Sequence, residues 1–582
     1  MLACRRSIVL SAPFRVVRRV STSSLQLGHD FLNSRKKSGV AFGNYEEHHD
    51  EESKECPQAR LTTTRNPIPD FHDARTTFEN KSTSELLRAA TCFQACKIPL
   101  LVENAEGLLR TSRQLFGGRI VNAALKATFY GQFCAGEDER GIQPVVEKLN
   151  NAGVGAILDY AAENDDPVEG VVVHPGNRSG VETLAPGSKT AHDYDYRYET
   201  QCDQHVLMFL QCINDVSATS KGGENHGYAA IKLTALGNPN LLARLSTTIV
   251  ETKRLFSIFD TNGDGFISRD EFETAYNHYF VDGDERIEEI FLEFDPLDTG
   301  FVDYIAWSTM FSTQDLPEMT KNCQAAGRLS DACPTDEEID LLNAMWKRCL
   351  ELGKEAAKID VRLLFDAEQV RYQPAIDNIV VGLQRRFNVG DKPIIYNTYQ
   401  CYLRDTPERL RTDAARSERF GYHFGAKVVR GAYMESEREL SALLNQEGPI
   451  HPTIEETHKC YNDSVEYIIR HSSKSNLVVE VMCATHNETS IVKAIESMNS
   501  HGIDRMASTV SFAQLYGMSD KLTFNLGKHG YRAYKYVPYG KVDEVMPYLL
   551  RRARENSAVV GGATEELQII ETELKTRCQI TK

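Results

Sequence analysis

The stretch that decides the fold is PIIYNTYQ (393–400), followed by PERLRTDAARSERFGYHFG (407–425) and AKVVRGAY (426–433). The first and last segments are short apolar runs of strand length, whereas the middle segment is polar with apolar residues at helical spacing. A strand, a helix and a second strand in this order form a right-handed unit in which the two strands are parallel. The sequence therefore predicts a parallel sheet that is covered by helices.

Six further runs of the same kind predict further buried strands. They are VGAILDY (154–160), AAIKLTAL (229–236), VRLLFDAE (361–368), NLVVEVMCATHN (476–487), RMASTVSFAQ (505–514) and YRAYKYVPYG (531–540). Eight strands that alternate with helices favour a closed (β/α)8 barrel over an open doubly wound sheet. Polar residues stand near the C-terminal ends of these runs, where the active-site face of such a barrel lies; they are Lys232, Asp366, Gln400, Arg430, Thr485, His486 and Tyr536.

Composition favours small-molecule chemistry. The 582 residues include 66 Lys and Arg against 82 Asp and Glu, which gives a formal charge of −16. Nucleic acid binding is disfavoured because it needs a clustered basic surface, and no such cluster stands out. The 14 cysteines contain no CxxC pair, a pattern typical of reduced thiols in an intracellular compartment. A Rossmann or P-loop nucleotide site is not supported, because neither GxGxxG nor GxxxxGK is present.

The ends and the middle of the chain differ in composition. Residues 1–29 contain Arg5, Arg6, Arg15, Arg18 and Arg19 without an acidic residue, which predicts a mitochondrial transit peptide, with a disordered basic tail as the alternative. Residues 30–75 are polar and predict a linker. We expect N-terminal helices and the first part of the barrel in 76–249, an insertion in 250–318 and the rest of the barrel in 319–582.

The insertion contains a calcium-binding motif of the EF-hand type, DTNGDGFISRDE (260–271). The oxygen ligands expected at loop positions 1, 3, 5, 7, 9 and 12 are Asp260, Asn262, Asp264, the carbonyl of Phe266, Ser268 and Glu271, and a glycine stands at position 6. An acidic surface loop is the alternative. A second copy, DPLDTGFVDYIA (295–306), lacks the bidentate glutamate, so we expect weak binding or none and a structural role. An EF-hand pair, all helical apart from a small β contact, is therefore expected.

The C-terminal stretch YRAYKYVPYGKVDEVMPYLLRRARENSAVV (531–560) contains the densest group of polar residues. A strand with Tyr536 is followed by a turn and a helix that carries Arg551 and Arg552. Glu555 is three or four residues away from each arginine and can pair with either. Two adjacent arginines can hold a carboxylate below the helix end, although such a pair on a helix is also common on a solvated surface.

This segment resembles the signature of the proline dehydrogenase (proline oxidase) family. The blocks AAIKLTAL, FDAEQV, YNTYQCYL, KVVRGAYMESE, CATHN and QLYGMSD resemble other parts of that family over residues 76–582. The resemblance implies a distorted (β/α)8 barrel with noncovalent FAD that oxidises L-proline to Δ1-pyrroline-5-carboxylate, the first step of proline catabolism. It also implies ubiquinone as the electron acceptor and peripheral contact with the matrix side of the mitochondrial inner membrane.

The resemblance also implies roles for single residues. Arg551 and Arg552 would clamp the proline carboxylate, and Glu555 would orient the two guanidinium groups. Tyr536 would pack over the ring of proline, Lys232 and Asp366 would form a pair beneath it, and Leu515 would be an apolar wall. Positions that match FAD contacts of the family are Gln400, Lys427, Val429, Gly431, Ala432, Tyr433, Thr485, His486 and Asn487. Many family members have arginine where this chain has Lys427.

Two alternatives to proline oxidation remain at this point. The first is hydroxyproline oxidation, which ranks lower because the bulky Tyr536 stands where the ring substituent needs room. The second is a calcium-responsive binding protein on a barrel without catalytic activity. We also hypothesise that calcium in the first loop modulates or stabilises the enzyme.

Overall fold

The computed structural model describes residues 65–160, 196–220, 227–281, 284–296, 298–310, 331–558 and 562–580. The predicted transit peptide and residues 30–64 of the predicted linker lie outside the described residues. Among the residues that are described, no helix combines the length and the apolar character needed to cross a membrane.

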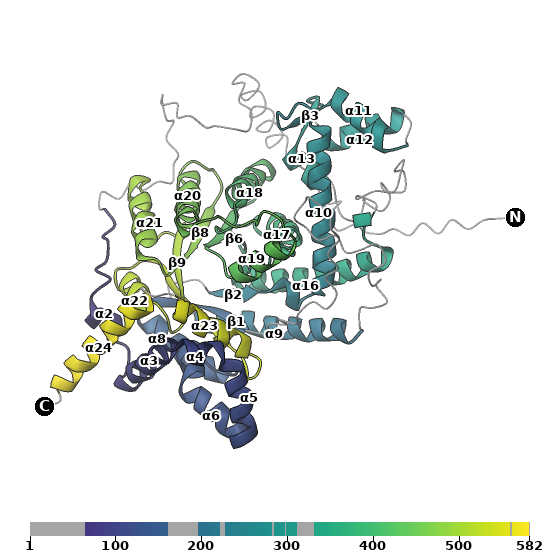
Figure 1. Cartoon of the computed structure of the whole chain (residues 1–582). Coiled ribbons are helices and arrows are strands. Elements are labelled where there is room, and N and C mark those ends of the chain that lie inside the picture. The colour runs from purple at the N-terminus through teal and green to yellow at the C-terminus, as the bar shows by residue number, and fades with distance from the viewer. Residues whose placement is uncertain are drawn as a thin grey trace.

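Eight parallel strands close into a barrel (Figure 1). In chain order they are β1 (Val154–Tyr160), β2 (Tyr228–Ile231), β5 (Arg362–Phe365), β6 (Ile395–Gln400), β7 (Phe424–Val429), β8 (Val479–Ala484), β9 (Val510–Leu515) and β10 (Ala533–Tyr539). Each falls within or overlaps one of the eight apolar runs, so the predicted barrel is confirmed. The barrel closes between β1 and β10, which pair in parallel from Val154 and Ala533 to Tyr160 and Tyr539.

Helices on the outside of the barrel connect the strands. They are α8 (Glu139–Asn151), α9 (Tyr196–Ser220), α10 (Pro239–Phe259), α16 (Asp336–Ile359), α17 (Gln373–Phe387), α18 (Thr406–Phe420), α19 (Met434–Leu443), α20 (Ile454–Ser472), α21 (Glu488–Ser500) and α22 (Asp520–Lys528). Capping side chains start several of them: Thr335 caps α16 in a reciprocal bond with Glu338, and Asn487 caps α21.

The inside of the barrel is filled at its N-terminal end. Apolar side chains such as Leu364 and Met482 lie there, together with the buried ion pair Arg362–Glu480 at 3.0 Å. The Tyr396 hydroxyl donates a hydrogen bond to the same Glu480 carboxylate. Because this end is closed by packed side chains, a site has room only at the C-terminal ends of the strands.

The two ends of the described chain pack together beside the barrel (Figure 1). The N-terminal helices are α2 (Ala74–Phe78), α3 (Thr83–Cys96), α4 (Pro99–Glu103), α5 (Ala105–Phe116), α6 (Gly118–Ala127) and α7 (Phe129–Phe133). The C-terminal helices are α23 (Met546–Ala558) and α24 (Gly562–Ile580). Leu86 of α3, Leu549 of α23 and Ile570 of α24 belong to one buried apolar cluster.

The last part of the predicted linker is structured. The backbone N–H of Asn66 donates to the side chain of Asn499, and the backbone carbonyl of Asn66 accepts from the same side chain. Phe71 is buried in the apolar cluster that includes residues of β7 and β8. The Tyr531 hydroxyl donates to the carbonyl of Pro67 at 2.5 Å. Residues 65–75 therefore pack on the barrel, because a few anchoring side chains outweigh the polar composition of the segment.

The insertion consists of two helix–loop–helix units. After α10 come β3 (Phe266–Ser268) and α11 (Arg269–Tyr279), and then α12 (Asp284–Phe294), β4 (Phe301–Asp303) and α13 (Tyr304–Met310). β3 and β4 pair antiparallel, and Trp307 of α13 lies in the core of the unit. The predicted boundary at residue 250 falls inside α10, which both packs on the barrel and enters the first loop.

Candidate active site

Asp366 lies at the centre of the polar groups at the C-terminal end of the barrel. It directly follows β5, and its carboxylate accepts hydrogen bonds from the Nζ of Lys427 on β7 and, at 2.7 Å, from the hydroxyl of Tyr536 on β10. The Lys427 Nζ also lies 5.4 Å from the centre of the Tyr536 ring. Three strands thus contribute to one hydrogen-bonded group, in which Asp366 balances the lysine charge and orients the tyrosine ring.

Lys232 lies next to this group at the end of β2. Its Nζ is 3.9 Å from the Oδ2 of Asp159 on β1. Glu368, two residues after Asp366, is buried and accepts hydrogen bonds from the backbone and hydroxyl of Thr234. Burial raises the pKa of Glu368 to about 7, although the Thr234 bonds and the Lys232 charge lower it. The sequence analysis did not single out Glu368, and its position in the FDAE block was the available signal.

The ends of β6, β7 and β8 bring together several residues predicted to contact FAD. Gln400 is buried and donates from Nε2 to the carbonyl of Glu368 at 2.8 Å. The carbonyl of Val429 accepts a hydrogen bond from Cys401 at 2.8 Å. Arg430 donates to the Thr485 hydroxyl at 2.6 Å and so ties the ends of β7 and β8 together.

Gly431 follows β7 in a conformation that requires glycine. Its φ is +131°, and a Cβ there would lie 1.9 Å from the ring of Tyr402. Gly431 is one of the residues predicted to contact a cofactor, and the Tyr402 ring leaves no room for a side chain at this position. Ala432 is exposed and Tyr433 is half-buried, so a stretch of accessible backbone follows β7.

His486 and Leu515 meet between β8 and β9. The backbone N–H of Leu515 donates to the Nε2 of His486 at 3.0 Å. Burial and the positive charges of Lys535 and Arg552 lower the pKa of His486 to about 3, so its imidazole is neutral near pH 7. Because Nε2 accepts, the proton lies on Nδ1, which is available as a donor. The neighbouring Asn487 caps α21 by accepting from the Ser490 N–H at 2.9 Å.

The arginine pair lies on α23, which follows β10. Arg552 is buried, with its Nη2 at 2.7 Å from Glu555 and its guanidinium 4.9 Å from the ring centre of Tyr548. Arg551 is half-buried. Within the described part of the chain, the buried Tyr548 hydroxyl has no hydrogen-bond partner. Tyr548 is a candidate site residue that the sequence analysis missed, although its spacing of four from Arg552 predicts that they share a helix face.

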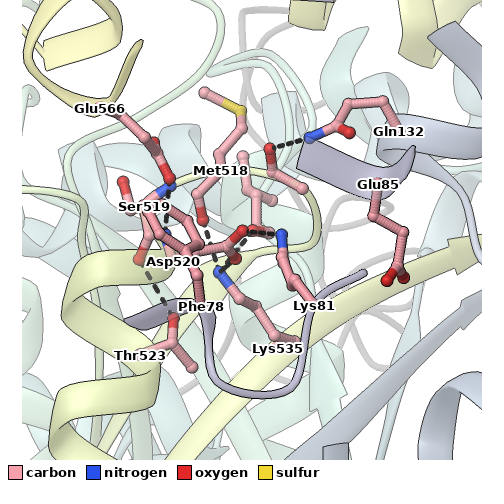
Figure 2. A network of polar contacts seen from close by, with 12 residues as sticks. Phe78, Lys81, Glu85, Gln132, Met518, Ser519, Asp520, Thr523, Lys535 and Glu566 are labelled. Atoms are coloured by element: carbon pink, nitrogen blue, oxygen red, sulfur yellow. Dashed lines mark hydrogen bonds and ion pairs between the residues drawn. The ribbon is translucent and has the colours of Figure 1, made fainter. Parts of the chain in front are cut away.

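A buried network of charges supports the loop that follows Leu515 (Figure 2). The Asp520 carboxylate contacts Lys81 and, at 3.0 Å, Lys535. Glu566 of α24 accepts hydrogen bonds from the backbone N–H groups of Ser519 and Asp520 at 2.7 and 2.8 Å. Lys535 also donates to the carbonyl of Leu515 at 3.2 Å. The network therefore holds the end of β9 against both terminal helical segments.

The predicted calcium loop has an internal set of hydrogen bonds. The two Asp260 oxygens accept from the N–H groups of Asp264 and Gly265 at 3.1 and 2.9 Å. Glu271 accepts from the hydroxyls of Thr261 and Ser268, both at 2.7 Å. Other predicted ligands also lie in this loop: the Asn262 side chain accepts from the Asp264 N–H, and Asp264 from the N–H of Phe266.

The oxygens of Asp260, Asp264 and Glu271 do not all lie within 4.8 Å of one another. Among the described residues, the one group of three His, Cys, Asp or Glu side chains whose ligand atoms all lie that close together is His72, Glu488 and Glu565. Lys521 forms ion pairs with both glutamates of that cluster, at 2.9 and 2.8 Å. A positive charge already neutralises these carboxylates, so we interpret the cluster as an ion-pair network.

Comparison with known proteins assigns the family. The sequence model named "Proline dehydrogenase" matches residues 247–564, more than half of the chain. This chain belongs to the proline dehydrogenase family.

Curated relatives of the family match almost the whole length. "Proline dehydrogenase 1, mitochondrial" of Homo sapiens is 35% identical over 89% of this chain and 91% of that protein. The protein of the same name from Caenorhabditis elegans is 34% identical over 87% and 88%. "Hydroxyproline dehydrogenase" of Bos taurus is 32% identical over 86% and 92%. Among solved structures, proline utilization A of Bdellovibrio bacteriovorus is 14% identical with a TM-score of 0.49, and the match covers 84% of this chain and 38% of that one.

Proposed function

We propose that this protein is an FAD-dependent L-proline dehydrogenase that forms Δ1-pyrroline-5-carboxylate. The observation that carries the proposal is the group formed by Asp366, Lys427 and Tyr536 at the C-terminal end of the barrel, with the arginine pair on the helix that follows. The family relationship supports the same reaction. The relatives named for proline oxidation have up to 35% identity to this chain.

The positive charges at the site fit an amino acid with a carboxylate. Arg551 and Arg552 would hold the carboxylate, because a guanidinium can bind both of its oxygens at once. Glu555 orients Arg552 through the 2.7 Å ion pair. Tyr536 would cover the ring of proline, since its hydroxyl is fixed by Asp366. Leu515 would form an apolar wall that keeps water away from the reacting carbon.

The residues beyond β6, β7 and β8 fit FAD in their chemistry. Gly431 and Ala432 present backbone without a large side chain, and neutral His486 offers an Nδ1 donor. The N-terminus of α21 at Asn487 suits a phosphate. FAD would supply the hydride acceptor at this site; the substrate would lose a hydride from the ring carbon beside the nitrogen and a proton from the nitrogen to form the imine. The protein positions both groups and excludes water.

An anaerobic absorbance titration tests this proposal. We expect the purified chain to contain a flavin whose band bleaches when L-proline is added. A bound flavin that stays oxidised with proline would contradict the substrate, and a chain without flavin would leave the calcium-responsive binding protein as the better explanation. Arg551→Met should raise the KM for proline strongly with the fold intact, and unchanged kinetics would refute the carboxylate clamp.

Hydroxyproline is a second candidate substrate, because relatives named hydroxyproline dehydrogenase are up to 32% identical to this chain. Tyr536 argues for proline, since its hydroxyl is bound to Asp366 and its ring would occupy the space that a ring substituent of the substrate needs. The ratio of kcat/KM for the two imino acids decides between them. We expect the ratio to favour proline.

We further propose that the electrons pass to ubiquinone at the matrix side of the mitochondrial inner membrane. The relatives named as mitochondrial and the arginine-rich N-terminus support this location. A proline-dependent reduction of a soluble quinone analogue would support the acceptor. Import of the full chain into isolated mitochondria, followed by cleavage of its N-terminus, would support the mitochondrial location.

We also propose that the loop 260–271 binds calcium. The oxygen donors stand at the required spacing, and the β3–β4 ladder joins the two loops as expected of paired hands. Burial raises the pKa of Glu271, but the hydrogen bonds of Thr261 and Ser268 outweigh it and lower the pKa below its ordinary value. Glu271 is therefore ionised near neutral pH, as a calcium ligand must be.

Calcium could act on the barrel through α13 and α18. Asp303 of β4 accepts from Arg419 at 2.7 Å, and Ser308 of α13 accepts from Arg416 at 2.9 Å. Both arginines belong to α18, which follows Gln400 of the candidate site. Activity and melting temperature measured with calcium and with a chelator test the coupling, and equal values in both conditions would refute it.

A further inference from the structure

An unusual apolar surface covers α4, α5 and α6. Six large apolar side chains of these helices are exposed, and four of them are more than 60% exposed: Leu115 at 72%, Leu100 at 71%, Ile120 at 64% and Phe116 at 62%. The others are Leu101 and Leu108. None of the residues of α5 is buried, and Val121 is the one buried residue of α6. Figure 1 shows α5 and α6 projecting from the side of the molecule.

The apolar side chains follow helical spacing. Leu108 and Leu115 are seven residues apart and share one face of α5. Ile120, Ala124 and Ala127 of α6 are exposed at spacings of four and three. Large apolar side chains that are exposed together on neighbouring helices mark an interaction site.

The charge of this segment is opposite to that of the chain. Residues 97–127 contain five basic and two acidic side chains, a net charge of +3, in a chain with a net charge of −16. Arg110 and Arg119 are exposed beside the apolar side chains. Exposed leucine and phenylalanine with flanking arginine are typical of helices that lie in the interface of a membrane and bind anionic lipid headgroups.

The length of the helices fits a position along the membrane surface. α5 has 12 residues, and a helix of that length extends about 18 Å, which is shorter than the hydrocarbon core of about 30 Å. We propose that the surface formed by α4, α5 and α6 docks on a membrane that contains anionic lipid. The acyl chains take up the exposed leucines and Phe116, and the phosphates pair with Arg110 and Arg119.

This surface is tied directly to the helix of the arginine pair. Glu106 of α5 forms an ion pair with Arg554 of α23 at 3.1 Å, and Arg113 of α5 contacts Asp543 in the turn before α23. The docked helices therefore hold the site at the lipid surface, where an acceptor dissolved in the bilayer is found. This consequence rests on the proposed function, whereas lipid binding itself does not.

Vesicle sedimentation with the full chain tests the proposal. The probes are vesicles of phosphatidylcholine alone and vesicles with an added anionic phospholipid. We expect binding to the anionic vesicles that weakens with salt, and the variant Leu115→Glu/Phe116→Glu should bind them at least about tenfold more weakly. A matched control is Val389→Glu/Leu443→Glu, because these apolar side chains are 63% and 69% exposed elsewhere on the molecule. The control should bind within about twofold of the parent.

Three results would overturn the proposal. The first is equal vesicle binding by the parent and the Leu115→Glu/Phe116→Glu variant. The second is an equal loss in the control. The third is a dimer in light scattering that this variant converts to a monomer without any change in vesicle binding, because a second copy of the chain would then cover the surface.

Proline-dependent reduction of a soluble dye separates this test from the proposed function. All three proteins should reduce the dye at rates within about twofold of one another, since the exchanged side chains are exposed on the surface. Absent dye reduction in the parent would refute the oxidation of proline. Intact dye reduction with unchanged vesicle binding would refute only the docking surface.

Discussion

Replacing Asp520 with asparagine should destabilise the protein strongly. The Asp520 carboxylate is 4% exposed and contacts two lysines, of which Lys535 is 1% exposed (Figure 2). In Asp520→Asn both lysines lose their nearest counter-charge, and Glu566 remains as a weaker one. Removal of one partner from a buried ion pair costs about 3–5 kcal/mol, since the remaining charge stays away from water. Burial already lowers the pKa of Lys535, so loss of its proton limits the cost to the lower end.

The pKa of Asp520 gives an independent figure of the same order. Burial raises this pKa, but Lys535 and Lys81 outweigh it and lower the pKa from 3.8 to about 2. A lowering of this size corresponds to roughly 2 kcal/mol. Because the folded pKa is lowered, this stabilisation is present above pH 3.8 and is lost as the pH falls toward 2.

Thermal unfolding at pH 7 measures the effect. A loss of about 3 kcal/mol lowers the Tm by roughly 2–3 °C in a chain of this size, because the entropy of unfolding grows with chain length. The matched control is Asp463→Asn on α20, whose partner Lys459 is 76% exposed, and it should change stability by less than about 0.5 kcal/mol. If the Tm of Asp520→Asn equals that of Asp463→Asn, the network does not hold the end of β9 and the reasoning is refuted.

Three further predictions concern the site, the pH dependence and the metal. Tyr536→Phe should lower kcat/KM for proline by about 10–100-fold, because it loses a hydrogen bond to the charged Asp366. The pKa of His486 is about 3 in the folded protein and 6.5 in the unfolded chain. Protonation of His486 in the unfolded chain should therefore lower the free energy of unfolding by about 2 kcal/mol as the pH falls from 7 to 5. His486→Gln should remove this loss in denaturant titrations. Glu271→Gln should weaken calcium binding in calorimetry by at least about tenfold, whereas Asp295→Asn in the second loop should not.

Each of these three has an outcome that contradicts it. Normal kinetics in Tyr536→Phe, judged against the exposed Tyr279→Phe, would remove Tyr536 from the site. Parallel pH curves for His486→Gln and the parent would show that His486 is protonated in the folded state. Equal calcium affinities in Glu271→Gln and the parent would place the metal elsewhere.

Much of the fold could be predicted because its signals are local. A parallel strand is buried on both faces, so each of the eight strands is a continuous apolar run that can be recognised without its partners. The polar residues that end those runs were recognisable for the same reason. Asp366, Gln400 and Tyr536 were predicted near the C-terminal ends of their strands, and the structure places them at that end of the barrel.

Other features depend on contacts that local patterns do not reveal. The sequence analysis placed Lys427 among the cofactor residues, whereas in the structure its ammonium group binds Asp366, 61 residues earlier in the chain. Glu368 became a candidate site residue only through its burial, which raises its pKa to about 7. Tyr548 became a candidate site residue only through the packing of α23 against the N-terminal helices, which buries it.

The sequence by itself determined the strands, the order of the strand and helix units, the spacing of the predicted calcium loop and the family. These depend on residues that are neighbours along the chain, where helix and strand periods and loop geometry act. Only the tertiary structure decided which charges meet, because barrel closure joins β1 to β10 and brings Tyr536 to Asp366 across 170 residues. Tertiary packing also places α24 against α3 and leaves the apolar faces of α5 and α6 outside the core.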